Sequence, residues 1–323
     1  MRLEHILALS LLLAPIARAQ QRLPDFEDFR RIDRTRRLTG QLQTAELMQV
    51  MHIDSSLVLR VTQQNTNDVR LLWGAAELIP DWSRKRELYL AAMRAGLSND
   101  AVRVRLMCAA AQNHDFELAR ATIQLSKRPE DTNILPWLCE IWMRLQEKRA
   151  TDDLAPAGWT SDFRDFSADA ARERIRVLEA AGYSQYAARR LGFMPDMYAI
   201  NIARDLGQPP VDTNAAPVLL RAGRAMQQRS PYLLVELVGQ TLERGVLASR
   251  EDADRSAEVR VRNAEIDQRR NELKALLADV EQNAVDLATE KEMVRYFDDV
   301  LNVGEENAMH RLAESVHGAP PAQ

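Results

Sequence analysis

The residues best suited to chemistry lie in an irregular stretch near the middle of the chain, residues 148–166. Asp162 directly precedes Phe163, and Asp165 follows it closely. Trp159 lies a few residues before both acids. Two carboxyl groups beside aromatic rings can hold a sugar and supply the acid and base for glycan cleavage. Such loops are more often solvated, with their aromatic rings turned inward. A glycan-cleaving enzyme is therefore one alternative, and not the main hypothesis.

The two cysteines, Cys108 and Cys139, are separated by about one length of the helical repeat described below. In an oxidising compartment they could form a disulfide, which requires Cα atoms within about 7 Å. The alternative is a pair of buried thiols that pack as small hydrophobic groups. Both states remain open at this point.

No other residues have the spacing of a catalytic, cofactor or metal site. The sequence contains no zinc-protease motif, nucleophile elbow, phosphate-binding glycine loop or calcium loop. His52, His114, His310 and His317 lack a second histidine or cysteine at metal-ligand spacing. We therefore predict no catalytic residue, no cofactor and no metal, and a protein that is not an enzyme.

The chain begins with features typical of a cleavable secretory signal, residues 1–19. Arg2 precedes an apolar run from Ile6 to Ile16, and Ala17-Arg18-Ala19 has the small residues that signal peptidase requires. The run is too short to cross a bilayer, no cysteine follows it, and no later segment is apolar enough to span. We expect a soluble periplasmic or secreted protein, cleaved near Ala19, without a stable membrane anchor.

Composition limits the remaining classes. The formal net charge is −4 and the pI is near 5.9, which argues against a nucleic-acid partner. Removing the signal leaves about 300 residues, enough for one large or two ordinary domains.

Apolar residues recur at spacings of three and four, and strand-like alternation is almost absent, which predicts an all-α fold. A charged lead-in, residues 20–40, is expected to dock Phe26 and Phe29 onto the main body. Residues 41–247 are predicted to form a helical-repeat body that contains the 148–166 insertion. The predicted helices span residues 44–51, 55–64, 68–78, 83–95, 100–112, 116–126, 133–146, 167–181, 184–190, 197–206, 216–228 and 231–244.

The first of these helices come in pairs with a period of about 32 residues. Asn67-Asp68, Asn99-Asp100 and Asp131-Thr132 each precede a helix at this interval. One helix pair per unit is typical of an α-solenoid of antiparallel pairs.

Residues 115–121, Asp-Phe-Glu-Leu-Ala-Arg-Ala, followed by Ile123 and Leu125, resemble the second helix of a tetratricopeptide repeat. The resemblance covers about one repeat, residues 100–131, and departs from the family where Asn113-His114 replaces the usual turn glycine. It implies a TPR-like solenoid whose concave groove binds proteins or peptides.

Residues 248–303 carry a heptad pattern that predicts a long C-terminal helix or helical hairpin. A capping box, Ser249 to Asp252, is expected to open it. Two packings are possible: a ridge against the repeat body, or a coiled coil that forms a homodimer or recruits a partner. A short helix and tail, residues 304–323, follow. The predicted ridge consists of Val259, Ile266, Leu273, Leu276, Leu277, Val280, Leu287, Val294 and Leu301.

These observations favour an exported, non-enzymatic scaffold or adaptor that binds a protein or peptide partner through a helical-repeat surface. The alternatives are a cell-envelope enzyme acting on glycans through the 148–166 insertion and a purely structural envelope component.

Overall fold

The computed structural model describes residues 22–39, 50–97, 99–126, 133–151, 162–193, 197–208, 211–229, 231–249, 257–280 and 287–317. Most of these residues are helical and none of them lies in a strand, which confirms the all-α prediction. The helices are α2 (Phe26–Thr39), α4 (Ser55–Gln64), α5 (Val69–Leu78), α6 (Trp82–Arg94), α7 (Asp100–Gln112), α8 (Phe116–Ser126), α9 (Leu135–Gln146), α10 (Ser167–Ala180), α11 (Gln185–Gly192), α12 (Met197–Leu206), α13 (Ala216–Arg229), α14 (Leu233–Ala248), α15 (Ala257–Asp279), α16 (Glu290–Val303) and α17 (Glu305–His317).

Short polar side chains set where the first helices begin. Asp54, Asp68 and Asn99 occupy the N-cap positions of α4, α5 and α7, and each accepts a hydrogen bond from a backbone N–H of the first turn. Such caps satisfy donors that the helix itself leaves unpaired. The observed bounds of α4, α7, α8 and α12 coincide with the predicted ones.

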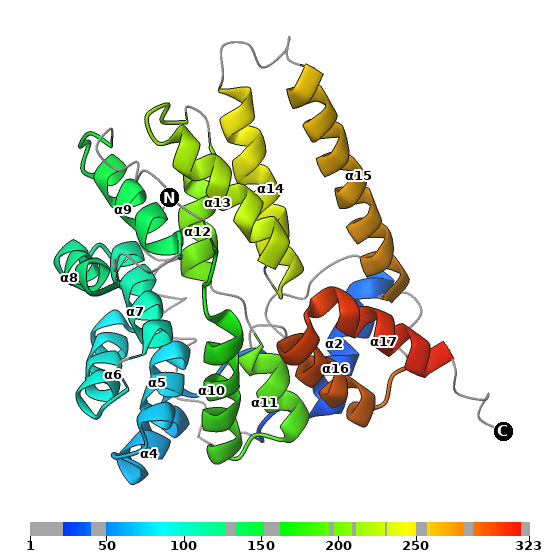
Figure 1. Ribbon diagram of the computed structural model, residues 1–323. Helices are drawn as coiled ribbons and strands as arrows, with labels where there is room; N and C mark the ends of the chain where they lie inside the picture. Colours follow the sequence, from blue (N-terminus) through cyan, green and yellow to red (C-terminus); the bar gives the residue numbers. More distant parts are fainter. Residues whose placement is uncertain are drawn as a thin grey trace, which may run out of the picture.

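The second half of the chain folds back onto the first (Figure 1). α5 packs against α6 and α7 against α8, but α10 then returns to pack on α5, and α12 packs on both α7 and α9. α7 is consequently buried on nearly all sides. In a simple solenoid each unit contacts only its neighbours, so these long-range contacts are a departure from that plan. α10 therefore covers part of the surface of α5, and α12 covers part of the surface of α7.

A buried ion cluster joins four of these helices. The Glu77 side chain of α5 is 1% exposed and accepts hydrogen bonds from Trp73 Nε1 (3.1 Å), Tyr89 Oη (2.5 Å) and Arg105 Nε (2.9 Å). Arg105 Nη2 also donates to the second carboxylate oxygen, and Arg174 Nη1 of α10 lies 3.9 Å from that oxygen. One carboxylate thus connects α5, α6, α7 and α10.

α13 and α14 approach each other unusually closely through two glycines. A Cβ on Gly223 would lie 2.8 Å from the carbonyl oxygen of Gly239, and one on Gly239 would lie 2.7 Å from the carbonyl oxygen of Gly223. Larger residues at these positions would push the helices apart.

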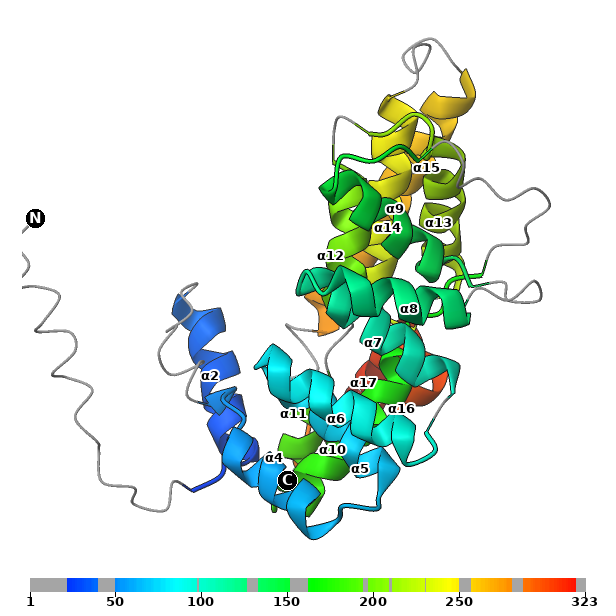
Figure 2. The same cartoon turned by 90° about the vertical axis from the view of Figure 1, so that its left-hand side faces the viewer.

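The ribbon of the N-terminal helix α2 lies at one edge of the helical body in Figure 2. Its side chains contact the body, as expected: the rings of Phe26 and Phe29 meet Tyr186 of α11 edge to face, with centroids 4.9 and 5.6 Å away. Arg190 Nη2 lies 3.2 Å from a carboxylate oxygen of Asp33. The predicted role of the two phenylalanines is confirmed.

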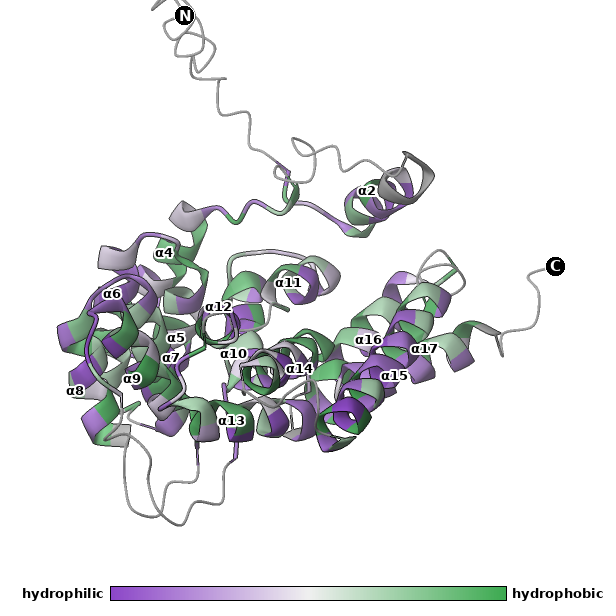
Figure 3. Cartoon of the chain, turned by 90° about the horizontal axis from the view of Figure 1, so that it is seen from above, coloured by the Kyte–Doolittle hydropathy of each residue, from purple (hydrophilic) through white to green (hydrophobic). Residues whose placement is uncertain are grey.

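The C-terminal heptad segment is divided. Ser249 is the C-cap of α14, so it ends a helix instead of opening one. Residues 281–286 lie outside the described residues, and the chain is not helical at residues 287–289. α15 packs beside α14, and its outward surface is largely hydrophilic (Figure 3).

Most of the predicted ridge is covered within the same chain. Val259, Ile266 and Leu273 are buried on α15, which contacts α14. The remaining ridge residues divide into three groups. Val280 and Leu301 are buried, and Leu287 is 67% exposed. Leu276, Leu277 and Val294 are partly buried against the hydrophobic cluster that contains Tyr186 and Phe297.

We expect Ile266→Val to lower the free energy of unfolding by about 0.5–1.5 kcal/mol, because it removes a methyl group from a packed site. The change should not depend on protein concentration, because the ridge packs within one chain. Chemical denaturation at several concentrations measures both. Val261→Ala is the matched control, since Val261 is 60% exposed on the same helix, and it should stay within about 0.5 kcal/mol. A denaturation midpoint that rises with concentration would instead indicate a dimer interface.

Candidate functional site

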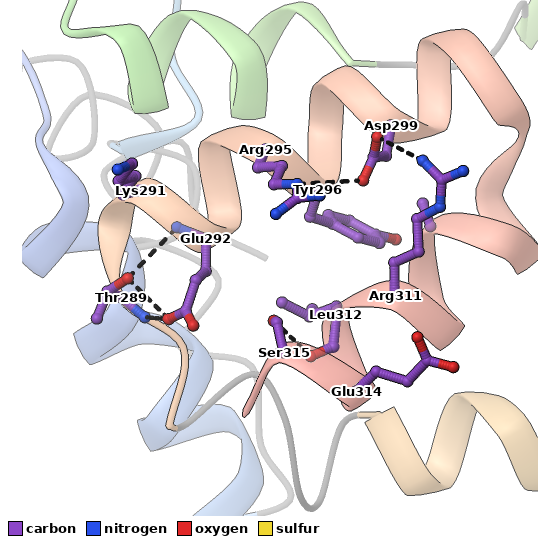
Figure 4. A pocket seen from close by; sticks show the side chains of 11 residues that line it. Thr289, Lys291, Glu292, Arg295, Tyr296, Asp299, Arg311, Leu312, Glu314 and Ser315 are labelled. Carbon is purple, nitrogen blue, oxygen red and sulfur yellow. Dashed lines mark hydrogen bonds and ion pairs between the residues drawn. The ribbon is translucent and has the colours of Figure 1, made fainter. Parts of the chain in front are cut away.

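The candidate functional site is a groove between α16 and α17 (Figure 4). α16 begins with a complete capping box: the Thr289 side chain accepts from the backbone of Glu292, and the Glu292 side chain accepts from the backbone of Thr289. It ends, as predicted, at Gly304, whose φ of 89° lies in the left-handed region that glycine tolerates. The turn directs α17 back along α16, and the two helices form the walls of the groove.

The first turn of α17 fixes this hairpin to the body. Glu305 accepts a hydrogen bond from the backbone N–H of Leu233 (2.8 Å), and its own N–H donates to the carbonyl of Pro231 (2.7 Å). Burial raises the pKa of Glu305, and the bond from Leu233 offsets part of this rise. The groove walls are therefore held at the start of α14.

Arg269 of α15 provides a second attachment. Its guanidinium donates to Glu306 of α17 (2.7 and 3.0 Å) and to Glu236 of α14 (2.8 and 3.2 Å). Bidentate pairs of this kind fix orientation as well as distance. One arginine thus ties α14, α15 and α17 together.

The groove has a volume of about 690 Å³. Its apolar lining consists of Tyr296, Leu312, which is 4% exposed, and Ala308, which is fully buried. Thr289 and Ser315 also line the groove. The charged lining consists of Lys291, Glu292, Arg295, Asp299, Arg311 and Glu314. This size lies within the range of ligand sites in proteins.

Two arginines converge on one carboxylate in this groove. Arg311 Nη1 donates to Asp299 Oδ1 (3.0 Å), and Arg295 Nε lies 3.8 Å from Asp299 Oδ2. The Asp299 side chain is 16% exposed, whereas those of Arg295 and Arg311 are 75% and 50% exposed. Each guanidinium carries five N–H donors, so most donors of both arginines remain directed away from Asp299. The pair can therefore receive an additional anionic group.

Two groups of the groove lining have shifted pKa values. Hydrogen bonds from the backbone and side chain of Thr289 hold the pKa of Glu292 below its ordinary value, despite its partial burial. Burial raises the pKa of Tyr296 well above that of an exposed phenol. At neutral pH the first group is ionised and the second is protonated, and a general acid or base works best near the operating pH. These two groups are therefore suited to binding.

The carboxyl groups predicted for glycan chemistry serve the local structure. Asp165 is buried and accepts from the backbone N–H and the hydroxyl of Ser167, at the start of α10. Asp162 is buried, pairs with Arg164 (2.6 Å), and its carbonyl accepts from Ile134. Residues 152–161 of the insertion, including Trp159, lie outside the described residues.

Cys108 of α7 and Cys139 of α9 are fully buried in the same hydrophobic cluster, on helices that contact each other. This placement is compatible with both predicted states, and the disulfide stays a prediction.

The histidines of the described residues do not form a cluster that could bind a metal ion. His52 and His310 are exposed, and the side chain of His317 lies outside the described residues. His114 occupies the turn between α7 and α8 with a φ of 59°, where the tetratricopeptide pattern has glycine, and its ring lies near Phe116. In the part of the chain that the structure describes, no group of histidine, cysteine or acidic residues could hold a metal ion.

Among the described residues, no helix has both the length and the apolar character required to cross a membrane.

A comparison of this chain with protein-family models, with curated proteins and with solved structures finds no match. The groove is therefore interpreted from its own geometry. Sequence reasoning missed it, although Arg295 and Asp299 have the (i, i+4) spacing of a helix ion pair. Arg311 could not be added, because its proximity depends on the turn at Gly304.

Proposed function

We propose that the protein is an exported, non-enzymatic scaffold or adaptor that binds an acidic segment of a protein partner in the α16–α17 groove. The observation that carries the proposal is the convergence of Arg295 and Arg311 on Asp299 beside an apolar floor. Guanidinium groups recognise carboxylates through paired hydrogen bonds. Tyr296 and Leu312 would receive the apolar side chains of the same segment.

The helical body would act as the support for this groove. We propose that α5–α8 derive from TPR-like helix pairs, with α10 and α12 occupying the side on which such repeats receive a peptide. A partner would then bind at the C-terminal hairpin instead of the repeat groove. Export would follow from the signal-like residues 1–19.

Replacing both groove arginines tests the proposal. We expect Arg295→Gln with Arg311→Gln to weaken partner binding roughly tenfold or more, because charge-assisted hydrogen bonds contribute about 1.5–3 kcal/mol each before solvent screening. Wild-type and variant proteins are used to capture partners from an envelope extract, with quantitative mass spectrometry. The affinity for each recovered partner is then measured at low and high salt.

The matched control is Arg60→Gln with Arg260→Gln, which makes the same change in charge at two exposed arginines on α4 and α15. Control and wild type should recover the same acidic partner, with an affinity that falls as salt rises. Equal recovery by the groove variant, or binding that does not respond to salt, contradicts the proposal.

A further inference from the structure

The long helix α15 has a narrow apolar contact with the rest of the chain. It lies alongside α14 at the edge of the helical body (Figure 1). Its buried residues are Val259, Ile266 and Leu273, which is one apolar side chain in every seven positions. A helix that packs on a globular core usually presents three or four apolar residues in every two turns. Polar contacts must therefore contribute to the attachment of α15.

Arginines of α15 reach buried acids on α14. Arg262 donates two hydrogen bonds to Glu243 (2.9 and 3.0 Å), whose side chain is fully buried. Seven residues further on, Arg269 donates to Glu236 (2.8 and 3.2 Å). Burial alone would raise the pKa of Glu243, but hydrogen bonds from Arg262 and from α13 outweigh it and hold the pKa below its ordinary value. Two buried acids of α14 thus depend on arginines of α15 for part of their charge compensation.

The contacts differ between the two ends of α15. Towards its end, Leu273 belongs to the hydrophobic cluster that contains Tyr186 and Phe297. In its first half, Val259 is buried and Arg262 forms the ion pair with α14. Salt screens the attraction between charges, whereas the burial of apolar surface involves no charge to screen. The first half of α15 is therefore the part that should respond to ionic strength.

We propose that α15 is an electrostatic strap that opens from its first half as ionic strength rises, and that its opening loosens the α16–α17 groove. The link to the groove is Arg269, which donates to Glu306 in the first turn of α17 as well as to Glu236. When α15 opens, α17 loses the contact of Glu306 and keeps that of Glu305 with Leu233. Control of partner binding by the strap rests on the function proposed above, but the opening itself is a property of the free chain.

Hydrogen–deuterium exchange of the full chain, resolved by mass spectrometry, tests the strap. Raising NaCl from about 0.1 M to about 1 M shortens the Debye length from about 10 Å to about 3 Å. We expect amides in the first half of α15 to exchange roughly three to ten times faster at the higher salt, because several partly exposed ion pairs weaken together. Amides in the first turn of α17 should accelerate by a smaller factor. Those of α13 and α14, which meet through Gly223 and Gly239, should stay unchanged.

Substitutions distinguish charge from packing. Arg262→Gln with Arg269→Gln should raise the exchange of α15 at low salt to near the wild-type rate at high salt, so that salt has little further effect. Ile266→Val, which removes a buried methyl group, should raise exchange by the same factor at both salt concentrations. The matched control is Arg260→Gln, at an exposed arginine of the same helix, and it should behave as wild type.

An exchange of charges separates the strap from a general loss of stability. Arg244 Nη2 of α14 lies 2.5 Å from a carboxylate oxygen of Asp267 on α15. Asp267→Arg places two like charges together and should raise the exchange of α15, and adding Arg244→Asp should lower it again. Circular dichroism establishes that each variant is folded.

Three results would overturn the proposal. The first is an α15 whose exchange in the wild type does not respond to salt, and the second is an α15 that exchanges only together with α14. The third is an acceleration confined to α15, since it would separate the strap from the groove. Failure of the groove to capture an acidic partner would contradict the proposed function and leave these measurements unaffected.

Discussion

Replacing Glu77 with glutamine is expected to lower the free energy of unfolding by about 3–5 kcal/mol, the usual loss when one partner of a buried ion pair is removed. The amide retains an oxygen that can accept from Trp73 and Tyr89, and its NH₂ group would face the donors of Arg105. Arg105 and Arg174 would then stay buried beside a neutral side chain. Chemical denaturation at neutral pH measures the loss.

The same variant should change the acid sensitivity of the protein. Burial alone would raise the pKa of Glu77, but Arg105, Arg174 and Lys85 outweigh it and hold the pKa far below its ordinary value. The stability that Glu77 contributes is therefore complete above the unfolded-state pKa and is lost as pH falls below it. Between about pH 5 and about pH 3, wild type should lose stability more steeply than Glu77→Gln.

Glu87→Gln is the control for both measurements, because Glu87 forms an exposed pair with Arg84. Its effect should be at most about 1 kcal/mol. A loss for Glu77→Gln no greater than that of the control would mean that the cluster contributes little to stability.

Gly74→Ala is expected to lower the free energy of unfolding by about 1–3 kcal/mol. This sign is opposite to the usual one, since alanine in a helix interior is about 1 kcal/mol more favourable than glycine. A Cβ on Gly74 would lie 2.2 Å from the carbonyl oxygen of Glu173 and 2.9 Å from Cγ2 of Val177. The oxygen belongs to the backbone of α10, so the contact can be relieved only if the helices separate.

Ala264→Gly calibrates this prediction, because Ala264 is exposed in the middle of α15. It should lose about 1 kcal/mol through helix propensity alone. If Gly74→Ala instead stabilises the protein by a similar amount, the close contact between α5 and α10 is absent in solution.

The predicted features that hold are those that neighbouring residues determine. Asp54 precedes α4, and its side chain can reach the first turn without help from any distant segment. The bounds of α7 and α8 follow from apolar spacing and from the polar turn that separates them. Gly304 ends α16 for an equally local reason, the positive φ that its turn requires.

The features that were missed depend on residues far apart in the chain. Glu77 follows a run of apolar residues in α5, and Arg105 is flanked by Val104 and Leu106 in α7, so both positions carried a local signal of a buried charge. Arg174, which lies close to Glu77, is almost a hundred residues further on than Glu77, and nothing local relates α10 to α5. The groove around Asp299 was missed for the same reason, because it exists only once α16 and α17 are packed.

The return of α10 and α12 onto α5 and α7 also has a consequence for the order of folding. The apolar surface of α7 cannot be covered until the chain has been made as far as α12, because α12 packs directly on it. Contacts between segments so distant in sequence form late and slow the search for the native state. During synthesis, the first helix pairs would therefore keep apolar surface exposed until α10 and α12 have been made. Chains with such exposed surface aggregate or bind chaperones. A chain that stops before α10 should accordingly aggregate, because its apolar surface stays exposed. The N-terminal helix pairs therefore form one half of a single cooperative folding unit.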